Sequence, residues 1–202
     1  MSRDLPIYSD STLRTRLQFE ALERLRGVDT AAIWEKSDDF ISKLEGARSV
    51  REAREEVQEA TKSGLLRMHS LMFTGELRGK SVQPLFRGHD CPDPQFIDRS
   101  LDNFFNWLTA ESLSEIHPIE RAALVLSRVV DIWPFETGNL TVAIMLANVG
   151  LRQAGLAPFF VLPEHKKEFM TVIAQAMAIE MQPLVNAIFS CIKREMEARE
   201  SG

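Results

Sequence analysis

The residues best suited to chemistry lie in one stretch, where the loop WPFETGN, residues 133–139, runs directly into an apolar helical segment. A glycine-containing loop that opens a buried helix presents unpaired backbone N–H groups, which suit an anion such as phosphate. Gly138 and Asn139 stand at the junction of loop and helix. The stretch therefore predicts a phosphate cradle, although a plain structural turn at the start of a helix explains the same two residues.

The histidines and cysteines indicate no second centre. The four histidines are dispersed, without the spacing of a metal-binding motif, so we predict no metal site. His69 lies on an otherwise apolar segment and is interpreted as a half-buried residue whose hydrogen bonds are satisfied. Cys91 and Cys191 are too few and too far apart for a disulfide framework or a metal knuckle.

The segment that follows the loop must position it. Between Leu140 and Leu151 the only strongly polar residues are Thr141 and Asn148, so apolar side chains surround the helix instead of forming one stripe. This pattern is typical of a helix buried on all sides. It predicts a central core helix against which the other elements pack.

Other helices are predicted from apolar residues that recur at three- and four-residue spacing and from the capping residues at their ends. Gly64 is expected to separate two of them, and Pro183 to separate the last two. The predicted helices cover residues 13–26, 31–46, 50–63, 65–73, 94–112, 118–132, 164–181 and 183–199.

One region, residues 74–94, cannot form a long helix because it carries three glycines and three prolines. Two short extended arms are predicted there, around residues 77–82 and 84–87. Pro84 suits an edge or a turn, so we expect an exposed β-hairpin, which we call the flap.

Composition indicates an ordinary globular protein. The 202 residues are 45% apolar and 26% charged, and the net charge of −5 gives no reason to expect nucleic acid or an anionic membrane as partner. The first residues, MSRDLPIYSD, lack an apolar signal core, and no apolar run is long enough for a membrane span, so a cytoplasmic location is expected. A single domain is predicted over residues 1–202, with N-terminal helices at 1–62, a core at 63–162 and C-terminal helices at 163–202.

The sequence WPFETGNLTVAI, from Trp133 to Ile144, resembles the signature H-P-F-x-[DE]-G-N-G-R-x-x-R of the Fic (Fido-fold) family. The segments LLRMHSLMF, GELRGKSVQPLFRG, NFFNWL and HPIERAALVLSRVVDI are similar to other parts of that family in the same order. SKLEG, with Ser42, Glu45 and Gly46, resembles the family's inhibitory segment. The resemblance implies an all-α Fic/Fido-type domain with a buried central helix and one small β-hairpin flap.

The departures from the signature bear on catalysis. The family's catalytic histidine corresponds to Trp133, whose indole N–H only donates, and its metal-holding acidic residue corresponds to Thr137. The two arginine positions are Thr141 and Ile144, which removes charge-assisted phosphate contacts. Loss of a general base alone typically costs about 10²–10⁴-fold in rate. No intact catalytic set is therefore expected, and the candidates for binding an anion or nucleotide are Pro134, Phe135, Glu136, Gly138 and Asn139.

The resemblance therefore implies a degenerate Fic-fold protein that lacks efficient AMP transfer and serves as a binding or regulatory module. Family flaps pair with a protein target, and the corresponding residues here are Leu77, Arg78, Val82, Leu85 and Phe86. The alternative is a nucleotidyl- or phosphotransferase that uses ATP and magnesium, with acid/base residues supplied by Glu136 or His89. An accessory role in a bacterial toxin–antitoxin system and a homodimer also stay open. Because the usual arginine partner of Glu45 is Ile144 here, Glu45 is expected to be exposed or paired with another cation.

Overall fold

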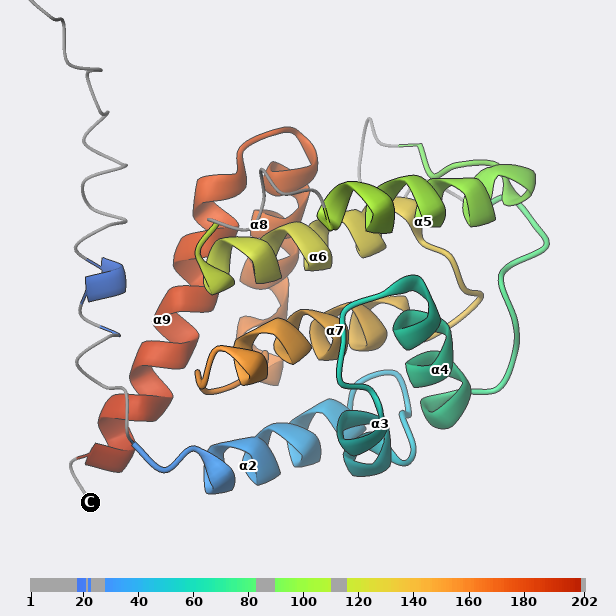
Figure 1. The fold of residues 1–202 in the computed structure, drawn as a ribbon. Helices are drawn as coiled ribbons and strands as arrows, with labels where there is room; N and C mark the ends of the chain where they lie inside the picture. Colours follow the sequence, from blue (N-terminus) through green and yellow to red (C-terminus); the bar gives the residue numbers. More distant parts are fainter. Residues whose placement is uncertain (1–17, 21, 23–27, 83–89, 110–115, 201–202) are drawn as a thin grey trace, which may run out of the picture.

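The computed structural model describes residues 18–20, 22, 28–82, 90–109 and 116–200. Within these ranges the chain is mostly helical and no strand is assigned, in agreement with the predicted all-α class (Figure 1). No helix in this part of the chain is both long and apolar enough to cross a bilayer. The elements are α2 (Ala31–Ser42), α3 (Val50–Glu56), α4 (Lys62–Met72), α5 (Pro94–Leu108), α6 (Pro118–Ile132), α7 (Asn139–Gln153), the 3₁₀ turn η2 (Pro163–His165), α8 (Lys166–Met177) and α9 (Met181–Glu200).

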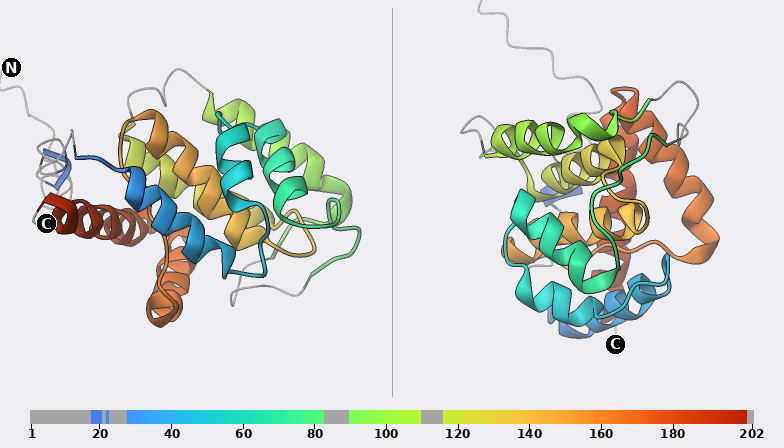
Figure 2. Two further views of the ribbon diagram at one scale, coloured as in Figure 1. Left: turned by 90° about the horizontal axis from the view of Figure 1, so that it is seen from below. Right: turned by 90° about the vertical axis from the view of Figure 1, so that its right-hand side faces the viewer.

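Helix α7 is the central helix that its apolar sequence predicted. Its side chains are buried continuously from Asn139 to Val149, and again at Leu151. Helices α5 and α6 cover one side of it and α2 and α3 the other, while α4 lies beside its N-terminal end (Figures 1 and 2). The loop that precedes α7 therefore leads directly into a helix that is buried along almost its whole length.

A buried polar residue of α7 fixes the chain that follows the helix. The Asn148 Nδ2 group donates to the Phe159 carbonyl oxygen at 2.9 Å, and the Phe159 N–H donates back to Asn148 Oδ1 at 3.0 Å. Both side chains are almost fully buried. The amide thus satisfies two backbone groups that would otherwise be costly to bury, which explains a polar residue in this apolar helix.

The predicted boundary at Gly64 is wrong. Helix α3 ends at Glu56, and α4 begins at Lys62, so Gly64 lies in the first turn of α4. Thr61 caps this helix, its Oγ1 accepting a hydrogen bond from the Gly64 N–H at 3.1 Å. A Cβ on Gly64 would lie 2.5 Å from the Glu59 carbonyl oxygen. The glycine therefore permits a close backbone approach inside a helix instead of ending one.

The expected hairpin is not seen in the described part of the flap. Residues 74–82 run without helix or strand, and Leu77 forms one isolated antiparallel bridge with Phe135 of the loop before α7. The second predicted arm, 84–87, lies outside the described residues. The first arm thus pairs with the loop before α7, because the backbone N–H of Arg78 donates to the Pro134 carbonyl oxygen at 2.9 Å. Most of the predicted first helix, 13–26, also lies outside the described residues.

Candidate functional site

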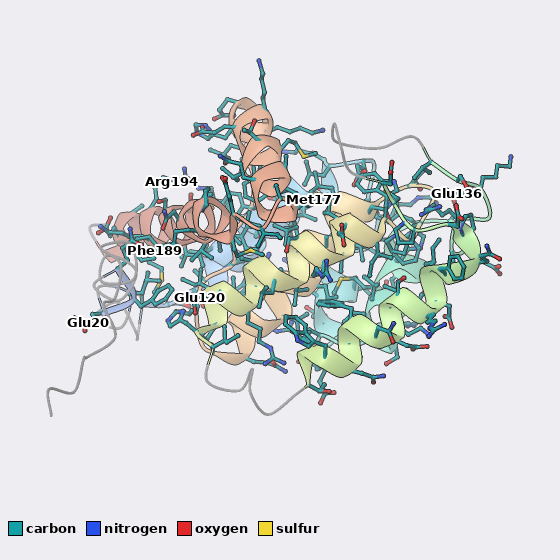
Figure 3. The ribbon with its side chains drawn as sticks, turned by 90° about the horizontal axis from the view of Figure 1, so that it is seen from above. Glu20, Glu120, Glu136, Met177, Phe189 and Arg194 are labelled. Atoms are coloured by element: carbon teal, nitrogen blue, oxygen red, sulfur yellow. The ribbon has the colours of Figure 1, made fainter. Side chains whose placement is uncertain are left out.

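The candidate site is built around residues 133–138, which we call the motif loop. Trp133 ends α6 in the left-handed backbone region, with φ of 48°, and its half-buried ring packs against the core. Glu136 and Thr137 are exposed at the tip, and Figure 3 shows Glu136 at the opposite side of the molecule from Arg194. Gly138, with φ of 77°, is the N-cap residue of α7. The loop thus reverses the chain between two buried helices and exposes only its tip.

Gly138 is required at its position for two reasons. Its positive φ lies in a region that other residues rarely adopt. In addition, a Cβ at this position would lie 2.5 Å from carbon atoms of the Phe73 ring. Gly138, which the sequence predicted to bind an anion, is therefore also needed for close packing against Phe73.

Asn139 locks the motif loop onto α7. Its Oδ1 accepts the Phe135 N–H at 2.9 Å, and its Nδ2 donates to the Phe135 carbonyl oxygen at 2.8 Å. Asn139 is fully buried and Phe135 is 1% exposed. The amide of Asn139 is consequently engaged by the protein's own backbone and is not directed at a ligand.

His69 of α4 supports the loop from beneath. Its ring stacks on the Phe135 ring, with centroids 3.7 Å apart and planes at 7°. Its Nε2 lies 3.2 Å from the Thr137 carbonyl oxygen, and because a carbonyl only accepts, this nitrogen carries the proton. Burial lowers the pKa of His69 below its ordinary value, although the hydrogen bond to Thr137 opposes this shift. The ring is therefore neutral at neutral pH.

This burial predicts a loss of stability in mild acid. The unfolded chain takes up a proton at His69 near pH 6.5, whereas the folded protein does so only at lower pH. Stability should therefore be lost as the pH falls below about 6.5, by at most about 1.4 kcal/mol per pH unit from this group. Urea unfolding at a series of pH values should show that the free energy of unfolding depends less on pH in His69→Phe than in the wild type. His165→Phe, which changes an exposed ring, should behave like the wild type, and an unchanged dependence in His69→Phe would contradict this account.

Arg78 ties the flap to the motif loop. Its side chain donates to three backbone carbonyl oxygens, those of Trp133 (from Nε, 2.7 Å), Lys80 (from Nη1, 2.9 Å) and Pro92 (from Nη2). The residue is 3% exposed. The guanidinium thus joins the loop to both ends of the described flap, and contact between Arg78 and a target would require this arrangement to open.

Glu45 occupies the N-terminal end of α7. Its Oε2 accepts the backbone N–H of Thr141 at 3.0 Å and the Thr141 hydroxyl at 2.8 Å. Glu45 and Gly46 both have positive φ, 49° and 71°, in the turn after α2. Glu45 is exposed, as expected, but its partners are an N–H and a hydroxyl instead of a cation. A carboxylate at a helix N-terminus is favourable, so the protein supplies its own anion there.

The first turns of α7 carry no positive charge at the two arginine positions of the signature. Thr141 and Ile144, at the predicted arginine positions, are fully buried and uncharged, and Thr141 is already engaged by Glu45. Among the residues that the structure describes, no group of three or more acidic, histidine or cysteine side chains could hold a metal ion.

The remaining predicted residues are spread over several environments. Pro134 is buried beneath the flap bridge, Ser42 is exposed and donates to the Asp39 carbonyl oxygen at 2.8 Å, and Val82 is half-buried. Leu85, Phe86 and His89 lie outside the described residues. The structure therefore brings together the motif loop, Glu45, Leu77 and Arg78. Sequence reasoning did not anticipate the part played by His69, for which its position on an otherwise apolar helix was the only available signal.

Comparisons with known proteins identify a matching family model and similar sequences. Residues 59–151 match the model of the Fic/DOC family. A protein adenylyltransferase Fic from Nematostella vectensis is 29% identical over 121 residues, which are 60% of this chain and 28% of that protein. The chain thus spans about a quarter of the length of this curated relative.

Solved structures share the fold. Fic-1 from C. elegans superposes with a TM-score of 0.72 at 16% identity, covering 95% of this chain and 72% of that one. IbpAFic2 in complex with adenylylated Cdc42 has a TM-score of 0.56 at 15% identity, covering 95% of this chain and 65% of that one.

Proposed function

We propose that the chain, whose residues 59–151 match the Fic/DOC family model, is a degenerate member of that family that lacks efficient AMP transfer. It acts as a binding or regulatory module through its flap and the remnant of a nucleotide pocket. The observation that carries this proposal is the pair of hydrogen bonds from Thr141 to the Glu45 carboxylate at the start of α7.

The anion site at the start of α7 is already engaged by Glu45. A phosphate at the N-terminus of α7 needs the N–H groups of the first turn, and the Thr141 N–H is bonded to Glu45. A second anion brought to this place would meet the Glu45 charge without an arginine to offset it, because Thr141 and Ile144 are neutral. Nucleotide binding is therefore weak, and it requires displacement of Glu45.

Trp133 and His69 are both unsuited to proton transfer at the surface of the motif loop. Trp133 stands at the position of the family's catalytic histidine, and its indole cannot accept a proton. His69 packs against the motif loop, but its protonated nitrogen faces the Thr137 carbonyl and the residue is only 2% exposed. Neither residue can act as the general base for a target hydroxyl at the loop surface.

The flap offers a surface to which a partner can bind. Gly79, Lys80 and Ser81 are exposed, and the segment is held at Arg78 by contacts with the motif loop. An exposed, anchored, non-helical segment offers main-chain groups to a peptide that adds alongside it. A structural neighbour captured with adenylylated Cdc42 shows that a Fic fold can engage a protein. We infer a protein partner that binds at the flap.

Removal of Glu45 should reveal the remnant pocket. In calorimetric titrations with ATP and magnesium, the wild type should bind more weakly than about 1 mM. Glu45→Ala should bind about fivefold more tightly, because one repulsive charge close to the phosphates is worth about 1 kcal/mol in water. Thermal unfolding with ATP provides an independent readout, since bound ligand stabilises the fold.

Glu136→Ala is the matched control, because it removes an exposed carboxylate from the same site without touching α7. It should leave the affinity for ATP unchanged. Wild-type binding tighter than about 0.1 mM that depends on magnesium and on Glu136 would favour the transferase alternative, in which Glu136 holds the metal.

A further inference from the structure

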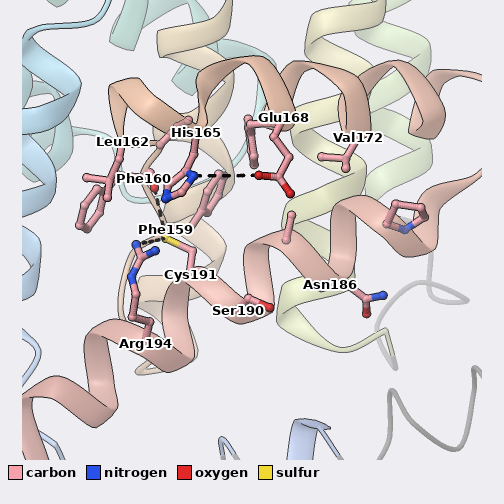
Figure 4. A pocket seen from close by; sticks show the side chains of 14 residues that line it. Phe159, Phe160, Leu162, His165, Glu168, Val172, Asn186, Ser190, Cys191 and Arg194 are labelled. Carbon is pink, nitrogen blue, oxygen red and sulfur yellow. Dashed lines mark hydrogen bonds and ion pairs between the residues drawn. The ribbon is translucent and has the colours of Figure 1, made fainter.

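A pocket of about 380 Å³ lies between α8, α9 and residues 159–162, and the motif loop contributes none of its lining (Figure 4). Figure 3 places Arg194, at one end of this pocket, and Glu136, at the tip of the motif loop, on opposite sides of the molecule. The volume lies within the range of small-molecule sites, roughly 300–1,000 Å³. The pocket is therefore independent of the site described above.

The inner wall of the pocket is aromatic. Phe159, Phe160 and Phe169 line it and are each less than 10% exposed, and the rings of Phe159 and Phe169 are 6.1 Å apart. Helix α9 contributes two small residues to the same lining, Ala187 and Ser190. Because these side chains are small, they leave space in the pocket that the protein does not fill.

One end of the pocket carries excess positive charge. Arg194 Nη2 lies 3.2 Å from Glu195 Oε1, and Lys36 Nζ lies 2.6 Å from the other oxygen of the same carboxylate. Two cations thus share one anion, whose side chain is 8% exposed, whereas that of Arg194 is 47% exposed. Glu195 does not line the pocket, and the carboxylate that does, Glu168, is 82% exposed, so water screens its charge. Figure 4 shows Glu168 across the pocket from Arg194.

We propose that this pocket binds a small apolar carboxylate, whose head group pairs with the Arg194 guanidinium and whose hydrocarbon or aromatic body lies against Phe159 and Phe169. A planar guanidinium matches a carboxylate geometrically and gives a charge-assisted contact. The aromatic wall removes the apolar body from water. Arg194 can turn toward such a ligand because the Lys36 contact keeps Glu195 paired.

Cys191 lines the same pocket without offering covalent chemistry. Its thiol donates to the Phe160 carbonyl oxygen at 3.1 Å, and burial raises its pKa above the ordinary value. The sulfur is therefore a protonated thiol at neutral pH and a poor nucleophile. The ligand is held by non-covalent contacts alone.

The test uses the full chain with phenylbutyrate as the probe and phenylbutanol as its neutral counterpart, measured by calorimetry and thermal shift. Phenylbutyrate should bind with a dissociation constant below about 1 mM, and phenylbutanol at least about tenfold more weakly. Arg194→Gln should weaken phenylbutyrate binding at least about tenfold, and Ala187→Phe, which fills the space, should abolish it. Arg199→Gln, an exposed change on the same helix that does not line the pocket, should bind like the wild type.

Each contrary result would overturn the proposal. Absence of phenylbutyrate binding to the wild type at several millimolar would show that the pocket is not such a site. Equal binding of the acid and the alcohol, or full affinity in an Arg194→Gln protein with unchanged thermal stability, would refute the role of the charge. If Arg194→Gln fails to fold, the comparison of acid with alcohol and the Ala187→Phe variant decide the question.

Discussion

Replacement of Arg78 by methionine should lower the free energy of unfolding by about 4 kcal/mol. The substitution keeps an apolar stem but leaves the carbonyl oxygens of Trp133, Lys80 and Pro92 without their donors. Hydrogen bonds from a charged donor contribute about 1.5–3 kcal/mol each, and the sum is reduced because the variant no longer buries a charge. Urea denaturation at neutral pH measures the change.

Arg67→Met is the matched control for Arg78→Met. Arg67 pairs with Glu56 at the surface, where both side chains are roughly half exposed, and such pairs contribute little to stability. It should unfold close to the wild-type midpoint. If Arg78→Met also unfolds close to the wild-type urea midpoint, the guanidinium does not hold the flap and the motif loop together.

The second large effect is expected for Asn139→Ala, which should lower the free energy of unfolding by about 3 kcal/mol. The variant leaves both the N–H and the carbonyl oxygen of Phe135 unpaired in a buried place. Each such group costs about 1–3 kcal/mol. Denaturant unfolding gives the total, and amide hydrogen exchange at Phe135 shows where protection is lost.

Asn148→Ala provides a control of the same chemistry on the same helix, because Asn148 clamps Phe159 as Asn139 clamps Phe135. The two variants should lose similar amounts of stability. Lower overall stability should speed amide exchange throughout the chain in both variants. An additional increase is expected at Phe135 only in Asn139→Ala, and at Phe159 only in Asn148→Ala. Equal exchange at both sites in both variants would refute the local clamp.

The sequence alone was sufficient for the elements whose pattern is local. Helix α7 is apolar on all faces, and α6 has a proline at its first position and a regular apolar spacing, so both were predicted close to their observed bounds. The boundary at Gly64 was misread because a glycine in a helical pattern more often marks an end than a close contact. The Thr61 cap was the signal that could have corrected it.

The candidate site depends on contacts that no local pattern contains. Glu45 meets Thr141 across 96 residues of chain, and Arg78 meets Trp133 across 55. The sequence indicated that Glu45 lacked its usual partner but could not indicate that a backbone N–H would replace it. Likewise, an arginine in a glycine- and proline-rich segment is expected to be exposed. The burial of Arg78 depends on the carbonyl oxygens of Trp133 and Pro92, which are 55 and 14 residues away along the chain.

The most direct test of the central claim is a search for covalent AMP transfer by the wild type and by Glu45→Ala. Each protein is incubated with labelled ATP and magnesium, alone and with a cell extract, beside an active Fic enzyme as positive control. Adenylyl groups are detected by label and by intact-protein mass spectrometry. We predict no adenylylated product above background in either case, because the general base and both arginines are replaced. Adenylylated product that appears with Glu45→Ala and disappears with Glu45→Ala/Glu136→Ala would contradict the proposal and identify the chain as an inhibited transferase.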